Sequence, residues 1–134
     1  MQLVVNIDVD DLEKAIQFYT AGLGLRLSRR LFDGTVAEMV GATSTIHLLL
    51  KRTETRPVAA SPLTREYGRH WTPVHLDFAV DDVHAAVARA RHAGANLEGD
   101  ITTHAWGRLA VMSDPFGHGF CLLPLSTTGY DAAA

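Results

Sequence analysis

Two stretches of the chain alternate apolar and polar residues with the period of a β-strand. In LVVNIDV, residues 3–9, every second residue from Leu3 onward is apolar, and VHLDFAV, residues 74–80, repeats this pattern 71 positions later. A period of two is typical of a strand that buries one face. Each stretch is therefore predicted to be a strand with one apolar and one polar face.

A helix is predicted directly after each of these strands. Each strand runs into a pair of aspartates whose second member, Asp11 or Asp82, can cap a helix by accepting a hydrogen bond from a free backbone N–H group. Apolar residues then follow with helical spacing, as Leu12, Ala15, Ile16 and Tyr19 in the first helix and Val83, Ala86, Val87 and Ala90 in the second. Glycines at 22, 24 and 94 are expected to end the two helices.

More strands are predicted after each helix. The first helix is followed by candidate strands at 26–31, 36–40 and 45–50, and the second by a weaker one near 96–98 and two more at 108–113 and 119–123. The last two are separated by DPFG, residues 114–117, which has the proline and glycine of a tight turn. The element order βαβββ is thus predicted to occur twice.

The 134 residues are predicted to form one domain made of two such modules. The expected parts are module 1 at about 2–51, a linker at about 52–71, module 2 at about 72–126 and a tail at 127–134. The linker contains two prolines and follows neither period. The basic residues of the linker and of its border with module 1 are expected to form a solvated surface (Lys51, Arg52, Arg56, Arg65 and Arg69), and the alanines of the tail suggest that the tail frays.

The polar face of each strand is the candidate binding surface. Each helix must bury its apolar stripe on the apolar strand face, which leaves the polar face uncovered. Two copies of a sheet-forming module can pair so that their uncovered faces enclose a groove, although such a face can also simply meet solvent. Strand alternation places the following residues on it: Val4, Asn6, Asp8, His47, His75, Asp77, Ala79 and Cys121.

Composition excludes several kinds of partner. The net charge is −3 and no Lys/Arg cluster is dense enough to bind nucleic acid. No apolar run approaches the roughly 20 residues of a membrane span, and the N-terminus lacks the pattern of a signal peptide. Cys121 is the only cysteine, which fits a reducing compartment. A cytoplasmic protein with no membrane or nucleic-acid partner is expected.

Three segments of this chain resemble the vicinal oxygen chelate superfamily. They are DVDDLEKAIQFYTAGLGL at 8–25, HLDFAVDDVHAAVARARHAGA at 75–95 and WGRLAVMSDPFGHGFCLL at 106–123. The superfamily includes glyoxalase I, fosfomycin-resistance enzymes, extradiol dioxygenases, methylmalonyl-CoA epimerase and bleomycin-binding resistance proteins. The resemblance implies an α+β fold in which two tandem βαβββ modules form a curved mixed sheet around a groove.

The resemblance also implies a position for a metal ion. Catalytic members hold one divalent ion through side chains on the first and last strand of each module, and the matching positions are Val4, His47, His75 and Cys121. Val4 has no donor atom, and Cys121 stands where the catalytic families usually have a glutamate. His47, His75 and Cys121 together would suit zinc, iron, nickel or cobalt. The alternative is that Cys121 is a small buried hydrophobe and that both histidines only form hydrogen bonds.

Three functions are compatible with these residues. The first is metal-free binding of a drug or metabolite, as in the resistance proteins, by Asn6, Asp8, His47, Trp71, His75, Trp106 and Cys121. The second is a metal-dependent lyase, isomerase or dioxygenase of the glyoxalase type, with Glu38 or Asp77 as catalytic base. The third is an accessory module whose groove is filled by its own side chains.

A homodimer is expected, because in this superfamily the groove often forms from modules of two chains and because exposed strand edges need protection. Static light scattering at micromolar concentration should therefore give twice the mass of one chain. A mass equal to that of a single chain over the whole concentration range would contradict this prediction.

Overall fold

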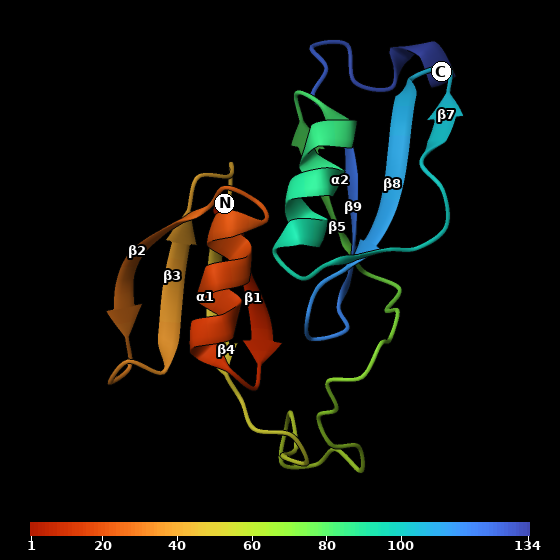
Figure 1. Cartoon of the computed structure of the whole chain (residues 1–134). Coiled ribbons are helices and arrows are strands. Elements are labelled where there is room, and N and C mark those ends of the chain that lie inside the picture. Colours follow the sequence, from red (N-terminus) through yellow and green to blue (C-terminus); the bar gives the residue numbers. More distant parts are fainter. The chain divides into compact units, whose positions relative to one another are not determined.

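The computed structural model describes all residues from 1 to 134 and divides into two compact units, Met1–Gly68 and Arg69–Ala134 (Figure 1). Each unit contains one α-helix and one mixed β-sheet. Neither helix has the length and apolar character needed to cross a membrane.

The first unit has the predicted order βαβββ. Its elements are β1 (Val4–Val9), α1 (Leu12–Ala21), β2 (Arg26–Leu31), β3 (Val36–Val40) and β4 (Thr45–Leu50). The sheet order is β1-β4-β3-β2, in which β1 runs parallel to β4 and the other neighbours are antiparallel. The three strands predicted after the helix are confirmed over their whole length.

The second unit repeats this arrangement with one addition. Its elements are β5 (Leu76–Val80), α2 (Val83–His92), β6 (Asn96–Leu97), β7 (Thr102–His104), β8 (Gly107–Ser113), β9 (Gly119–Pro124) and a 3-10 turn, η1 (Asp131–Ala133). The sheet order is β5-β9-β8-β6, with β5 parallel to β9. The exposed strand β7, which pairs with β8, was not predicted, because three residues are too few to show a period.

The two helices begin and end 71 positions apart, as the sequence repeat predicts. Asp11 accepts a hydrogen bond from the backbone N–H of Lys14 at 3.0 Å, and Asp82 accepts one from Ala85 at the same distance. Both aspartates therefore cap their helices by satisfying an N–H group that has no partner inside the helix. The α+β fold with two βαβββ modules is confirmed.

Each helix covers one face of its own sheet. In α2 all four predicted stripe residues are buried. In α1 the predicted core residue Ile16 is partly exposed, and Phe18 is buried instead. The Phe18 ring packs edge-on against Tyr19, with 5.1 Å between the ring centroids. Ile46 and Leu48 of β4 are buried in the same core, and His47 between them is not. The face of each sheet that carries no helix is called the open face below.

The segment after β4 binds the first unit closely. Arg65 donates from Nε to Asp8 Oδ2 at 2.6 Å, and its Nη1 donates to the carbonyl of Arg56 at 2.8 Å. The backbone N–H of Arg65 donates to Thr55 and its carbonyl accepts from Glu54, both at 2.8 Å. The expectation that Arg65 belongs to a solvated surface is wrong, because its side chain is only 15% exposed and closes this loop onto β1.

Replacing Gly107 by alanine should destabilise the protein more than replacing Gly34. Both glycines have positive φ, +137° and +83°, so both alanines meet backbone strain of about 1–2 kcal/mol. A Cβ atom at Gly107 would in addition overlap the ring of Pro124, whereas one at Gly34 meets open space. Urea unfolding followed by circular dichroism should show the larger loss for Gly107→Ala, by about 1–3 kcal/mol. Equal losses would contradict the contact with Pro124.

Candidate functional site

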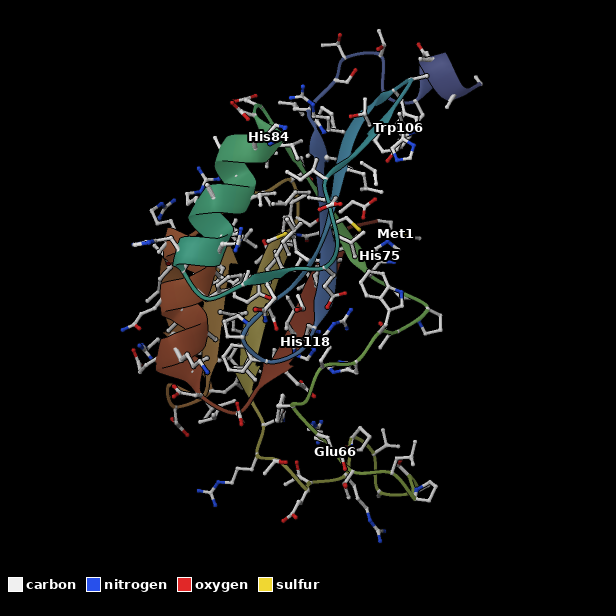
Figure 2. The ribbon with its side chains drawn as sticks, turned by 45° about the vertical axis from the view of Figure 1, so that its right-hand side comes forward. Met1, Glu66, His75, His84, Trp106 and His118 are labelled. Atoms are coloured by element: carbon white, nitrogen blue, oxygen red, sulfur yellow. The ribbon has the colours of Figure 1, made fainter.

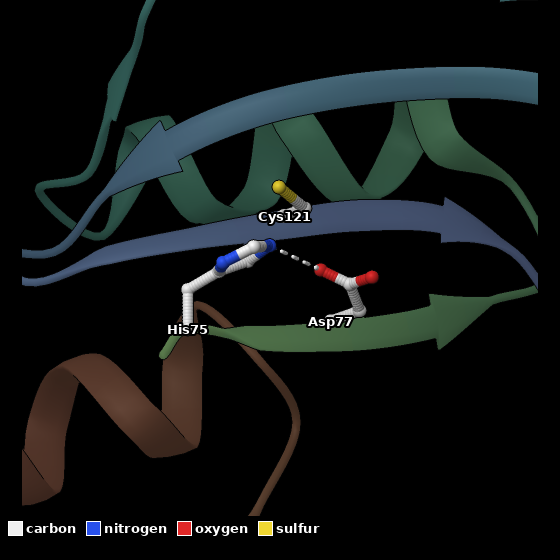
Figure 3. Close-up of side chains that lie close together, drawn as sticks. All are labelled: His75, Asp77 and Cys121. Atoms are coloured by element: carbon white, nitrogen blue, oxygen red, sulfur yellow. Dashed lines mark ion pairs between the residues drawn. The ribbon is translucent and has the colours of Figure 1, made fainter. Parts of the chain in front are cut away.

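Three potential ligand side chains converge on the open face of the second unit. Asp77 on β5 is directly opposite Cys121 on β9, and His75 precedes β5 by one residue. Residues two apart in an extended chain share a face, so His75 and Asp77 point the same way. One ligand atom from each of the three lies within 4.8 Å of the others, and His75 Nε2 is 3.4 Å from Asp77 Oδ1 (Figure 3). The predicted proximity of His75 and Cys121 is present in this unit.

An aromatic surface adjoins this cluster. The ring of Trp71 packs over Gly119 so closely that a Cβ atom there would overlap it, so a glycine is required at the start of β9. The Trp71 and His75 rings are 4.9 Å apart between centroids, with planes inclined by 37°. Trp71 is nevertheless 46% exposed. The site therefore combines a partly open indole ring with an imidazole, a carboxylate and a thiol.

The residues just before Trp71 fasten it to the second unit. Arg69 forms a two-point ion pair with Glu98, one of whose hydrogen bonds joins Nη2 to Oε2 at 2.6 Å, and its guanidinium lies 5.2 Å from the Trp71 ring centroid. These hydrogen bonds lower the pKa of Glu98. Arg69 is exposed, as expected of a residue on a solvated surface, but its guanidinium is also held by this ion pair. The only feature of the sequence that indicates this ion pair is the basic and aromatic run RHW at 69–71, just before the strand.

The thiol of Cys121 is protected by its surroundings. Cys121 is 5% exposed, and burial, followed by the nearby Asp77 carboxylate, raises the pKa of its thiol to about 11. The thiol is therefore protonated at neutral pH and is a poor nucleophile. A metal ion would have to displace this proton before it could bind the sulfur.

A separate polar row crosses the open face of the first unit. Strand register places Asn6 beside His47, His47 beside Glu38, and Glu38 beside Arg29. Arg29 donates to both carboxylate oxygens of Glu38, at 3.0 and 3.1 Å, and His47 Nε2 lies 3.5 Å from Glu38 Oε2. The hydrogen bonds from Arg29 lower the pKa of Glu38, which makes this predicted base a weak one.

Two of the expected binding residues have other partners. Asp8 accepts the hydrogen bond from Arg65 described above. Trp106 stacks on His104 with parallel planes 4.9 Å apart between centroids, and Tyr130 of the tail meets it edge-on at 5.0 Å.

The two tryptophans lie at opposite ends of β9. Trp71 packs on Gly119 at its start, whereas Gly107, which follows Trp106, lies against Pro124 at its end. Figure 2 accordingly shows Trp106 well separated from His75. The two indoles therefore do not form one binding surface.

Comparison with known proteins connects this geometry to a family. A family model described as a glyoxalase-like domain matches residues 4–123. Over 52 residues the chain is 42% identical to an uncharacterized protein of Mycobacterium tuberculosis, a match that covers 38% of this chain. The match spans about a third, 31%, of the length of that curated relative.

Two crystal structures share the fold over nearly the whole chain. A glyoxalase-related enzyme from Fulvimarina pelagi is 19% identical with a TM-score of 0.70, over 96% of this chain and 94% of that one. An antibiotic-binding protein from a Streptomyces species is 27% identical with a TM-score of 0.65, over 94% of this chain and 96% of that one. The fold thus occurs in a protein named as an enzyme and in one named as a binding protein.

Alkylation should test the protected state of Cys121, which is the only thiol in the chain. With a pKa of about 11, its reaction with iodoacetamide at pH 8 should be about 100-fold slower than that of a cysteine peptide, whose thiol has a pKa of about 8.5. The rate should rise about tenfold per pH unit until the pH approaches 11, because the thiolate is the reacting form. Protein unfolded in urea should react at the rate of the peptide. Equally fast reaction of folded protein would contradict the assignment.

Proposed function

Because this chain belongs to the family of glyoxalase-like domains, we propose that it binds a small organic molecule without a metal ion, as a drug- or metabolite-binding protein. The antibiotic-binding protein of the same fold, which is 27% identical, supports this proposal. We further propose that the protein acts in the cytoplasm as a homodimer, as its single cysteine and exposed strand edges favour.

The close packing of the Trp71 ring on Gly119 is the main observation that supports this proposal. It holds a large flat ring in place while leaving 46% of the residue exposed, so a planar ligand can stack on it at little entropic cost. Such aromatic pairs contribute about 0.5–1.5 kcal/mol beyond the apolar area they bury. His75 and Asp77 stand beside the ring and offer hydrogen-bonding groups that would orient the ligand.

The charges at this site favour a neutral or cationic ligand. Glu98 neutralises Arg69, so the cation nearest to the indole is already paired. The side chain of Asp77 is 42% exposed, and it faces the imidazole of His75 rather than an arginine or lysine. A cationic aromatic compound would therefore gain more from this site than an anionic one of the same shape.

The donor groups favour binding without metal. The first strand of module 1 supplies Val4, which has no donor atom. The Cys121 thiol keeps its proton up to a pH of about 11, which weakens it as a ligand at neutral pH. Glu38, the carboxylate beside His47, is already held by two hydrogen bonds from Arg29.

A divalent-metal-dependent lyase, isomerase or dioxygenase is the second candidate. The observation that favours it is the approach of His75, Asp77 and Cys121, whose ligand atoms lie within 4.8 Å of one another. Nitrogen, oxygen and sulfur donors of this kind suit zinc, iron, nickel or cobalt. A bound ion would supply Lewis acidity toward substrate oxygens. Asp77 would then bind metal or move a proton, but not both.

Binding of planar dyes tests the first candidate. A cationic acridine dye should bind with fluorescence quenching of tryptophan, and an anionic anilinonaphthalene sulfonate should bind more weakly. Trp71→Ala and Gly119→Ala should each weaken acridine binding at least about tenfold, or about 1.4 kcal/mol. The first substitution removes the indole ring, and the second displaces it from its position on β9. The matched control is Gly68→Ala, where an added Cβ meets open space. Unchanged affinity in both site variants would refute the proposal.

Elemental analysis separates the two candidates. The protein is incubated with zinc, nickel, iron, cobalt or manganese and then dialysed. If it binds its ligand without a metal ion, the wild-type protein should retain no more metal per chain than His75→Ala does. One full equivalent that disappears in His75→Ala would instead support the metal-dependent enzyme.

A further inference from the structure

Two histidines outside the cluster around Cys121 face each other in the second unit. His70 Nε2 and His118 Nδ1 are 3.1 Å apart, and their rings are nearly perpendicular, at 88°, with 4.9 Å between centroids. His70 precedes β5, whereas His118 ends the turn before β9, so 48 positions of chain separate them. Both are half-buried. Neither belongs to the residues of the proposed ligand site.

One turn fixes the backbone of both histidines. The N–H of His70 donates to the carbonyl of Gly117 at 3.1 Å, and the N–H of His118 donates to Asp114 Oδ1 at 3.0 Å. The same carboxylate oxygen accepts from Phe116 at 2.8 Å, and Asp114 is only 2% exposed. The two imidazoles are therefore brought together by the fold, and a ligand that joined them would not have to order the chain.

We propose that His70 and His118 form a binding site for a divalent cation that prefers imidazole, namely copper, nickel or zinc. Metal–nitrogen bonds of about 2.0–2.1 Å place two nitrogens on one ion roughly 3.0–3.4 Å apart, and the observed separation falls in this range. Imidazole is a favoured donor for all three ions, and water completes the coordination.

Protons balance when the ion binds. In the free protein one N–H links the two rings, since neutral imidazole has one donor and one acceptor nitrogen. On binding, that proton moves to the other nitrogen of its own ring, and both facing nitrogens present lone pairs to the ion. Starting from two neutral rings, this step leaves both rings neutral.

The site would act on the proposed ligand site, and this step rests on the proposed function. His70 is followed by Trp71, and His118 by Gly119, on which the Trp71 ring lies. An ion that joined the two histidines would fix the segment that holds the indole to the strand beneath it. Bound cation should therefore tighten the binding of a planar ligand by reducing the entropy lost on binding.

Titration of the full chain with copper(II) tests the site. Electron paramagnetic resonance should show one equivalent with nitrogen ligands, and the same ion should raise the thermal unfolding midpoint. His70→Gln and His118→Gln should each lose this equivalent while keeping the wild-type far-ultraviolet circular dichroism. His75→Ala should retain it, as should the matched control His84→Ala, an exposed histidine of α2. The proposal would be overturned if both glutamine variants still bound one equivalent of copper, or if His75→Ala lost it.

The coupling is tested separately with zinc and the acridine dye. Zinc should tighten dye binding in the wild-type protein and in His84→Ala but not in His118→Gln. Copper binding that depends on His70 and His118, together with dye affinity unaffected by zinc, would overturn only the coupling. Loss of dye binding in every condition would count against the proposed function and leave the cation site standing.

Discussion

The parallel pairing of the first and last strand of each module is the constraint on which the site depends. Because β1 lies beside β4 and β5 beside β9, residues more than 40 positions apart share one face of a sheet. The helix between them must cover the other face to bury its apolar stripe, so the open face is the one left for polar side chains. Cys121 and Asp77 meet for this reason, and so do His47 and Asn6.

Arginine partners divide the acidic residues near these open faces into two groups. Glu38, Asp8 and Glu98 each hold a close ion pair with an arginine, namely Arg29, Arg65 and Arg69. The hydrogen bonds from Arg29 and Arg69 lower the pKa of Glu38 and Glu98, which makes these two carboxylates weak bases, and all three carboxylates already accept hydrogen bonds from an arginine. Asp77 differs, since its close partners are His75 and the thiol of Cys121. Among the predicted acidic site residues, Asp77 is therefore the one best able to contact a ligand.

Sequence periodicity was sufficient for the fold. The doubled alternation and the two capping aspartates each depend on residues close together in the sequence, so all elements of the repeat except β7 could be predicted with errors of only a few residues. Strand parity also predicted that Asp77 and Cys121 share a face. Ile16 was assigned to the core and Phe18 was not, because Ile16 falls in the i, i+3, i+4, i+7 pattern that starts at Leu12, whereas Phe18 at i+6 does not.

Periodicity could not predict the ion pairs of Arg65 with Asp8 in the first unit and of Arg69 with Glu98 in the second. Arg65 and Arg69 lie in a segment without a period, and their partners are 57 and 29 positions away. Local composition reports only that such residues are charged, and a charged residue in an irregular segment is usually solvated. The contact between Trp71 and Gly119 was missed for a similar reason, because a glycine in a strand indicates a close approach without identifying the partner.

Whether the site suits metal-free binding or metal-dependent catalysis depends on the protonation of the Cys121 thiol. A catalytic site of the family's kind needs donors that are ready for the ion at neutral pH, and burial together with Asp77 works against this by stabilising the neutral thiol. A positive ion would reverse the effect of Asp77, since both the carboxylate and the thiolate would then be stabilised by it. The same three side chains are therefore compatible with either state, but the metal-free state costs no deprotonation. Trp71 needs neither a proton nor an ion to stack on a ligand, which is why binding is the function that these residues support most directly.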